Sequence, residues 1–154
     1  MPQHIIIRPA TPHDMPTLLQ FEQGVIRAER PFDITLDNDP INYYDLHQLI
    51  TASHIQLLVA QAGDELIGSG YARIETAKPY LRHRQYAYLG FMFVVEAWRG
   101  KGVNKLILDA LKEWALALGM TELRLEVYHE NEPALRAYEK VGFSRLMIEM
   151  RMGL

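Results

Sequence analysis

The 154-residue sequence contains no cysteine. A chain without thiols has no disulfide framework, no thiol nucleophile and no thiolate metal site. Its six histidines are scattered without the spacing of metal ligands, so we expect no bound metal.

Long apolar runs are also missing. No segment approaches the roughly 20 apolar residues of a membrane span. The first four residues, Met-Pro-Gln-His, do not form a charged leader followed by an apolar run. We therefore expect no membrane association and a cytoplasmic location. The net charge of −3 offers no general electrostatic reason to bind nucleic acid.

What the sequence does contain is enough apolar material for one core. Apolar residues make up 49% of the chain, and 154 residues is close to the usual size of one domain. We find no repeat, low-complexity tract or interdomain linker. We expect residues 1–154 to form a single domain.

The periodicity of the apolar residues predicts a mixed α/β fold. Residues 122–128 show the alternation of a strand, because Leu123, Leu125 and Val127 fall on one face and Arg124, Glu126 and Tyr128 on the other. Strands are predicted at 4–8, 55–61, 65–75, 86–95, 122–128 and 145–152. Helices are predicted at 13–28, 40–53, 101–118 and from Asn131 to about Val141. The strands of the front half should be mainly antiparallel.

The most informative segment is a glycine-containing turn between a strand and a helix. Gly100 follows Arg99 directly, and Gly102 lies two residues further on. Both lie between the predicted strand at 86–95 and the first turn of the predicted helix at 101–118. Glycines let the backbone approach a ligand closely, and the free N–H groups of a helix start favour an anion. These residues alone also fit a tight connection with solvated basic side chains.

Two signatures resemble those of the GNAT superfamily of acetyl-CoA-dependent N-acetyltransferases. Arg99 to Asn104 resembles the pyrophosphate loop, Arg/Gln-x-x-Gly-x-Gly/Ala, although Asn104 stands where glycine or alanine is usual. Asn131 to Phe143 resembles the second signature, Asn-x-x-Ala-x-x-x-Tyr-x-x-x-Gly-Phe. The resemblance covers residues 88–143 and, more loosely, the first strand. It implies a mainly antiparallel central sheet, splayed at the cofactor site and flanked by about four helices.

The resemblance also implies which residues hold acetyl-CoA. The splay would let the strand edge at Met92, Phe93 and Val94 bind the amides of the pantetheine arm. The remaining expected cofactor contacts are Arg99, Gly100, Lys101, Gly102, Val103, Asn104, Lys105, Asn131 and Tyr138. Asn104 is small, tolerates unusual backbone angles and can donate a hydrogen bond, so we interpret it as an accommodated variant.

Acetyl transfer to an amine needs a base and an acid. An alkyl ammonium has a pKa of roughly 10.4, so only about one molecule in 2,500 is neutral at pH 7. The resemblance assigns Tyr138 as the general acid for the leaving thiolate, although a tyrosine there could simply pack on the helix. Glu126 is the best candidate for the base, with a structural role or catalysis through water as the alternative. Glu75 and Tyr128 are weaker candidates.

The amine acceptor is the part of the predicted function that the sequence determines least. Six carboxylates between Glu22 and Asp45 outweigh two arginines, which would attract a cation, although a solvated acidic loop explains them equally well. The basic run Arg82 to Arg84 is most simply solvated. The predicted function is N-acetyl transfer by direct attack of a primary amine, either a small cationic amine or a peptide N-terminus or lysine. A non-catalytic acyl-CoA-binding or sensing domain is the alternative, and a homodimer is left open.

Overall fold

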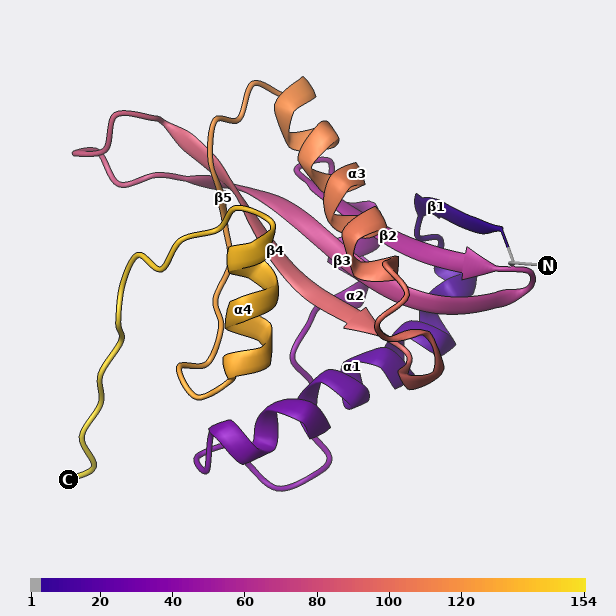
Figure 1. The fold of residues 1–154 in the computed structure, drawn as a ribbon, viewed down its shortest axis with the longest axis horizontal. Coiled ribbons are helices and arrows are strands. Elements are labelled where there is room, and N and C mark those ends of the chain that lie inside the picture. The colour runs from indigo at the N-terminus through magenta and orange to yellow at the C-terminus, as the bar shows by residue number, and fades with distance from the viewer. Residues whose placement is uncertain (1–3) are drawn as a thin grey trace.

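The computed structural model describes residues 4–154 (Figure 1). Its strands are β1 (Ile5–Pro9), β2 (Ile55–Ala62), β3 (Glu65–Thr76), β4 (Gln85–Val94) and β5 (Leu123–Arg124). Its α-helices are α1 (Met15–Glu29), α2 (Leu46–Thr51), α3 (Val103–Ala117) and α4 (Glu132–Lys140). Short 3-10 turns precede α1, follow it, and follow β4. No helix in this part of the chain is long and apolar enough to cross a membrane.

The five strands form one sheet in the order β1-β2-β3-β4-β5. The first four pair antiparallel, whereas β4 and β5 run parallel. That parallel ladder has only two residue pairs, Ala87 with Leu123 and Tyr88 with Arg124. Beyond Tyr88, within residues 4–154, no strand pairs with β4 on this side, so the sheet splays open there. The predicted fold class is confirmed.

Two apolar clusters cover the faces of the sheet. On one face the stripe of α3, with Val103, Ile107 and Leu111 fully buried, packs against β2, β3 and β4. On the other face α1 and α2 contribute residues such as Leu18, Phe21 and Leu49. On α1, Phe21 is buried, whereas Leu19 is exposed.

The start of α1 is tied to β1 by an ion pair. Both guanidinium nitrogens Nη1 and Nη2 of Arg8 donate to the Asp14 carboxylate at 2.9 Å, and the backbone N–H of Thr11 donates to the same carboxylate at 2.7 Å. These interactions hold the pKa of Asp14 below its usual range, with the Arg8 hydrogen bond as the largest cause. These hydrogen bonds between Arg8, Thr11 and Asp14 fix the angle at which α1 leaves the sheet.

Three predicted elements differ in the structure. Residues 145–152 do not form a strand, because the extended chain after Phe143 has no partner strand within the described residues. The predicted strand 122–128 is reduced to Leu123–Arg124, since β4 diverges from it. The predicted helix 40–53 is only α2, which begins where the Asp45 side chain accepts a hydrogen bond from the Gln48 N–H at 3.1 Å.

Candidate active site

The strand β4 changes direction beyond Tyr88, where the sheet splays open. The register between β3 and β4 shifts between Ser69 and Tyr71, and Phe91 has a positive φ of 54°. Buried Ser69 holds this bulge, because its hydroxyl donates to the Phe91 carbonyl at 2.9 Å. A bulge of this kind bends a strand and alters its pairing. It brings the segment Met92 to Val94 to the open side of the sheet.

The predicted phosphate loop follows β4 and ends at α3. Gly100 and Gly102 have φ values of 75° and 82°, a region that favours glycine, and Gly102 is the N-cap of α3. A Cβ built on either glycine meets nothing within 4 Å, so the open space beside the loop is not filled by the protein. The first intrahelical donor of α3 is the Leu106 N–H, which leaves the N–H groups of residues 103–105 without a helical acceptor.

The basic side chains of the loop are held in different ways. Arg99 Nε donates to the Val94 carbonyl at 3.0 Å, which closes the turn. Lys101 lies over the Trp98 ring, with Nζ 5.3 Å from the ring centroid. Lys105 is paired with Asp109 at 2.7 Å one helical turn later. The donors at this loop without a helical acceptor are therefore the backbone N–H groups of residues 103–105.

Tyr138 lies beside this helix start. Its ring packs edge-on against Phe143, with centroids 5.7 Å apart. Burial raises the pKa of Tyr138, and a hydrogen bond with the side chain of Asn104 offsets part of the shift. The structure thus brings together the predicted acid and the one loop residue that departs from the GNAT pattern. Asn131, the remaining predicted contact of this region, caps α4 by accepting from the Ala134 N–H at 3.4 Å.

The predicted base lines a separate pocket of about 490 Å³. Glu126 is exposed there and accepts a hydrogen bond from the Tyr88 hydroxyl at 3.2 Å. Glu75, the weaker candidate, is bound to Arg73, whose guanidinium lies 5.4 Å from the ring centroids of both Tyr71 and Tyr88. The lining residues are Tyr43, Tyr44, Asp45, Gln48, Leu49, Tyr71, Arg73, Glu75, Tyr86, Tyr88 and Glu126.

Tyrosines dominate this pocket, although they were not predicted from the sequence as site residues. Burial is the main cause that raises the pKa of Tyr44, Tyr71 and Tyr88, so their hydroxyls are neutral donors at physiological pH. The alternation of β3 indicated that some of these residues share a face, because Tyr71, Arg73 and Glu75 are each two positions apart. Tyr128, proposed as an alternative base, stacks on Phe32 outside this lining.

The carboxylates of the acidic segment between Glu22 and Asp45 are engaged in different ways within the protein, and attraction of a cation by this segment stays a prediction. Glu22 is fully buried and accepts from the Asn42 side chain at 2.6 Å and from the N–H groups of Tyr43 and Tyr44 at 3.0 and 2.8 Å. Of the carboxylates in this segment, Asp45 lines the tyrosine-rich pocket. Two others are paired with arginines, Asp33 with Arg151 and Asp39 with Arg30.

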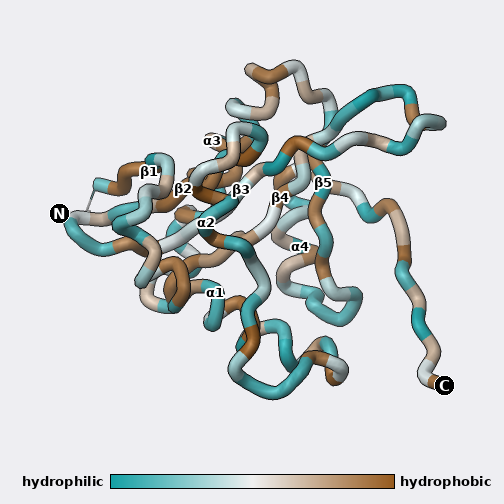
Figure 2. The backbone as a smooth tube through the Cα atoms, turned by 180° about the vertical axis from the view of Figure 1, so that it is seen from behind, coloured by the Kyte–Doolittle hydropathy of each residue, from teal (hydrophilic) through white to brown (hydrophobic). Residues whose placement is uncertain are grey.

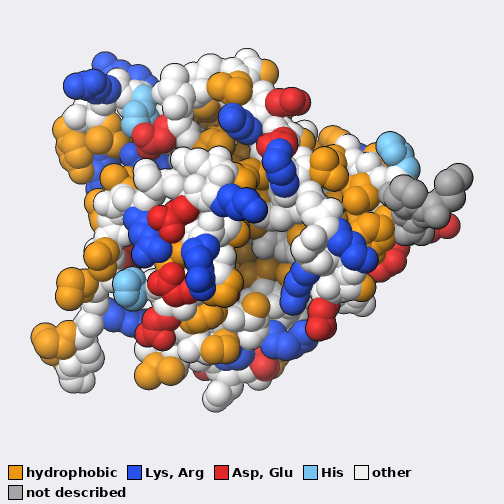
Figure 3. All heavy atoms as spheres, in the orientation of Figure 1, with side chains coloured by type: hydrophobic (Ala, Val, Ile, Leu, Met, Phe, Trp, Pro, Cys, Tyr) orange, Lys and Arg blue, Asp and Glu red, His pale blue; other side chains and the backbone are white. Residues whose placement is uncertain are grey.

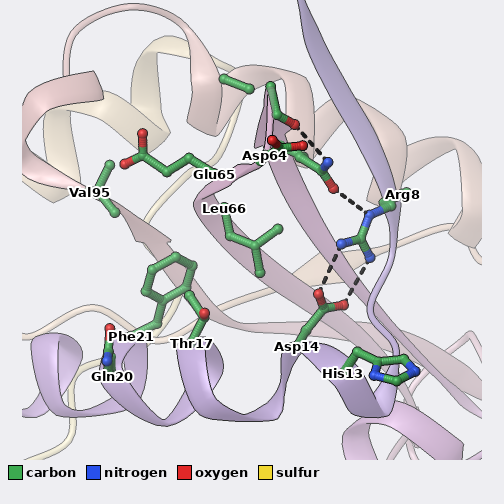
Figure 4. Close-up of a pocket in the computed structure, with 13 residues that line it drawn as sticks. Arg8, His13, Asp14, Thr17, Gln20, Phe21, Asp64, Glu65, Leu66 and Val95 are labelled. Carbon is green, nitrogen blue, oxygen red and sulfur yellow. Dashed lines mark hydrogen bonds and ion pairs between the residues drawn. The ribbon is translucent and has the colours of Figure 1, made fainter.

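A second, larger cavity of about 900 Å³ lies between α1 and the hairpin of β2 and β3 (Figure 4). Arg8 and Asp14 line it but bind one another, and Phe21, Leu66 and Val95 supply its apolar wall. None of the predicted catalytic residues lines this cavity. On the face with α4, Figure 3 shows a different hollow beside this helix, with Lys and Arg side chains around its rim. No group of three or more potential ligands for a metal is found in residues 4–154.

Residues 22–143 match the acetyltransferase (GNAT) family. An uncharacterised N-acetyltransferase of Bacillus subtilis, YdgE, is 38% identical over 74 residues, which are 48% of this chain and 47% of that protein. The chain thus matches about half the length of this curated relative.

Solved structures share the fold over nearly the whole chain. A tetramutant of the BH1408 protein of Bacillus halodurans is 25% identical with a TM-score of 0.85, covering 97% of this chain and 99% of that one. The aminoglycoside N-acetyltransferase AAC(6′)-Iy in complex with CoA is 21% identical with a TM-score of 0.75, covering 100% and 97%. The latter likeness concerns the fold alone.

Proposed function

The chain belongs to the acetyltransferase (GNAT) family, and from this premise we propose that it transfers an acetyl group from acetyl-CoA to a primary amine. One observation supports this most: backbone N–H groups of residues 103–105 have no helical acceptor at the start of α3, and the Asn104 side chain there lies close enough to lower the pKa of Tyr138 of α4. In this proposal the loop that would bind the pyrophosphate lies beside the candidate acid. We further propose that residues 1–154 act as one domain.

The residues present fit acetyl-CoA. The N–H groups of residues 103–105 and the open space at Gly100 and Gly102 suit its pyrophosphate. The edge of β4 from Met92 to Val94 suits the amides of the pantetheine arm, which would lie there like an added strand. Acetyl-CoA supplies the activated thioester, and the chain supplies binding and proton transfer.

In this proposal two side chains handle the protons of the reaction. Glu126 accepts a proton from the ammonium, directly or through water, so that the free amine can attack the thioester carbonyl. Tyr138 donates its proton to the departing thiolate and is reprotonated, directly or through water, by the second proton that the attacking nitrogen loses as the amide forms. Since burial raises its pKa, Tyr138 keeps that proton through the physiological range. No covalent intermediate on the enzyme is required.

The tyrosine-lined pocket supports a small cationic amine as acceptor. Its volume of about 490 Å³ lies in the range of small-molecule sites. Aromatic faces and carboxylates attract ammonium groups, and neither Asp45 nor Glu126 takes part in an ion pair among residues 4–154. The fold likeness to an aminoglycoside acetyltransferase is consistent with this class. A peptide N-terminus or lysine is the second candidate.

The test is thiol release from acetyl-CoA against a panel of amines that includes diamines, aminoglycosides and peptides. We expect turnover with at least one small cationic amine, and a lower rate for Tyr138→Phe at unchanged acetyl-CoA affinity. Binding of acetyl-CoA without turnover on any amine would instead support the sensing-domain alternative. Absence of both binding and turnover would contradict the proposal altogether.

A further inference from the structure

Glu126, the proposed base, lies on a segment without strand pairing among residues 4–154. β4 and β5 share only two residue pairs, and Tyr88 with Arg124 is the last of them. Glu126 follows that pair, where β5 has ended. Backbone without ladder hydrogen bonds opens and moves easily, whereas a general base must stay within hydrogen-bond reach of the proton that it accepts. A side-chain contact is therefore needed to fix the carboxylate.

Alternation places Glu126 on the same face of the sheet as Tyr88. Leu125 packs into the apolar cluster under α3. Successive side chains of an extended chain point to opposite sides, so Glu126 faces the side of α1 and α2, where Tyr88 packs. The apolar and polar residues that alternate beyond β5 can be followed along the chain in Figure 2. The two side chains thus meet on one face at the point where the two strands stop pairing.

Tyr88 joins the two sides of the splay through its hydroxyl. This group donates to Glu126 Oε1 at 3.2 Å, the one hydrogen bond of the Glu126 side chain within residues 4–154. Burial raises the pKa of Tyr88, so its hydroxyl keeps the proton and remains a donor through the physiological range. A donor to a carboxylate favours the charged form, which is the form that accepts a proton.

The ring of Tyr88 is itself held in place. Arg73 lies directly opposite Tyr88 in the register of β3 and β4, and its guanidinium carbon is 5.4 Å from the centroid of the Tyr88 ring. A cation over an aromatic face is attracted to it. Glu75 binds the same guanidinium, and the Tyr71 ring lies 6.5 Å from the Tyr88 ring. The hydroxyl is therefore presented to Glu126 from a fixed ring.

We propose that Tyr88 is a positioning residue for the base, because its hydroxyl holds the Glu126 carboxylate across the splay toward the ammonium of the acceptor. This inference rests on the proposed function, in which Glu126 takes the ammonium proton. The other titratable or charged residues that line the pocket are Tyr43, Tyr44, Asp45, Tyr71, Arg73, Glu75 and Tyr86. None of them donates to Glu126 within the described part of the chain, so no second donor replaces the Tyr88 hydroxyl.

Tyr88→Phe removes the hydroxyl and keeps the ring beside Arg73. Without this donor the charged form of Glu126 is less stable, so the pKa of Glu126 should rise by about one unit. The acidic limb of the kcat/KM profile, measured by thiol release with a turned-over amine, should move to higher pH by the same amount. Because the base is no longer held in place, kcat should fall about ten- to a hundredfold, with the KM for acetyl-CoA unchanged.

The matched control is Tyr86→Phe. Tyr86 lies on the same strand and lines the same pocket, but its ring contacts Arg124, whose guanidinium carbon is 4.5 Å from the ring centroid. Whatever this variant does to the KM of the amine, the acidic limb should stay at the parent's pH. Titration of the Glu126 carboxyl carbon by NMR measures the same pKa shift without turnover, so the comparison does not depend on finding the acceptor.

A double variant separates this inference from the proposed function. Adding Tyr88→Phe to Glu126→Gln should change kcat by less than about twofold, because no carboxylate is left to position. A parental rate profile in Glu126→Gln contradicts the proposed base and this inference with it. A lower rate in Glu126→Gln but not in Tyr88→Phe overturns the inference alone. Additive losses in the double variant, or a Glu126 pKa that shifts in both tyrosine variants or in neither, overturn it as well.

Discussion

Replacing Gly102 by valine tests the phosphate loop most directly. Gly102 has a φ of 82° and forms the N-cap of α3, and no atom lies within 4 Å of an added Cβ. A clash inside the protein is therefore not the source of any effect. A β-branched residue in the left-handed region costs roughly 1–2 kcal/mol, so Gly102→Val should lose that much free energy of unfolding. For a chain of this length the melting temperature should fall by about 2–8 °C.

The chain offers a matched control at the other end of the same helix. Gly119 has a φ of 84°, and an added Cβ there also meets nothing within 4 Å. Gly119→Val should therefore lose a similar amount of stability. Only Gly102→Val should weaken acetyl-CoA binding, because a shift of its backbone turns the N–H groups of residues 103–105 away from the phosphate. One lost charge-assisted hydrogen bond already corresponds to about tenfold in affinity.

The measurement is titration calorimetry with acetyl-CoA, paired with calorimetric melting of the parent and both variants. Parental affinity in Gly102→Val, with the expected loss of stability, would refute the assignment of the loop to phosphate. An equal loss of affinity in Gly119→Val would show that general destabilisation, and not the loop, controls binding. Either result would leave the family membership untouched.

Three further variants test other parts of the proposal. Tyr138→Phe should lower kcat about ten- to a thousandfold without changing acetyl-CoA affinity, and equal rates would remove Tyr138 from the mechanism. Glu126→Gln should lose activity mainly at low pH and recover as rising pH deprotonates the amine in solution, whereas a profile that superimposes on the parent's would make Glu126 structural. Asp14→Asn should cost about 2 kcal/mol of unfolding free energy at pH 7. Since Arg8 lowers the folded pKa of Asp14, this deficit should shrink in acid melts as pH falls below the unfolded value of about 3.9, and a constant deficit would contradict the ion-pair account.

The sequence predicted those parts of the fold that local patterns determine. The helix α3, the strands β2 and β3 and the glycine turn at Gly100 and Gly102 follow from periodicity and turn chemistry. The last predicted strand was wrong because alternation at 145–152 specifies a strand only when a partner edge is present. The predicted strand at 122–128 was longer than the observed β5, because its pairing depends on where β4 bends.

The candidate site was less accessible from sequence, because its pieces come from distant segments. The loop at 99–105 is local and was identified, although its role in binding stays a prediction. The contact between Asn104 and Tyr138 joins α3 to α4, and no spacing rule predicts it. The burial of Glu22 within the acidic segment was not predicted, because it depends on tertiary packing.

The buried carboxylate of Glu22 also bears on the pocket where we propose that the acceptor binds. Its oxygens hold the backbone N–H groups of two consecutive tyrosines, so the wall that carries Tyr43 and Tyr44 is attached to the rigid helix α1. A ligand that contacts these rings meets a surface already in place. Little conformational entropy then remains to be lost when the acceptor binds, and more of the contact energy appears as affinity. The pocket is thus preorganised from the core outward.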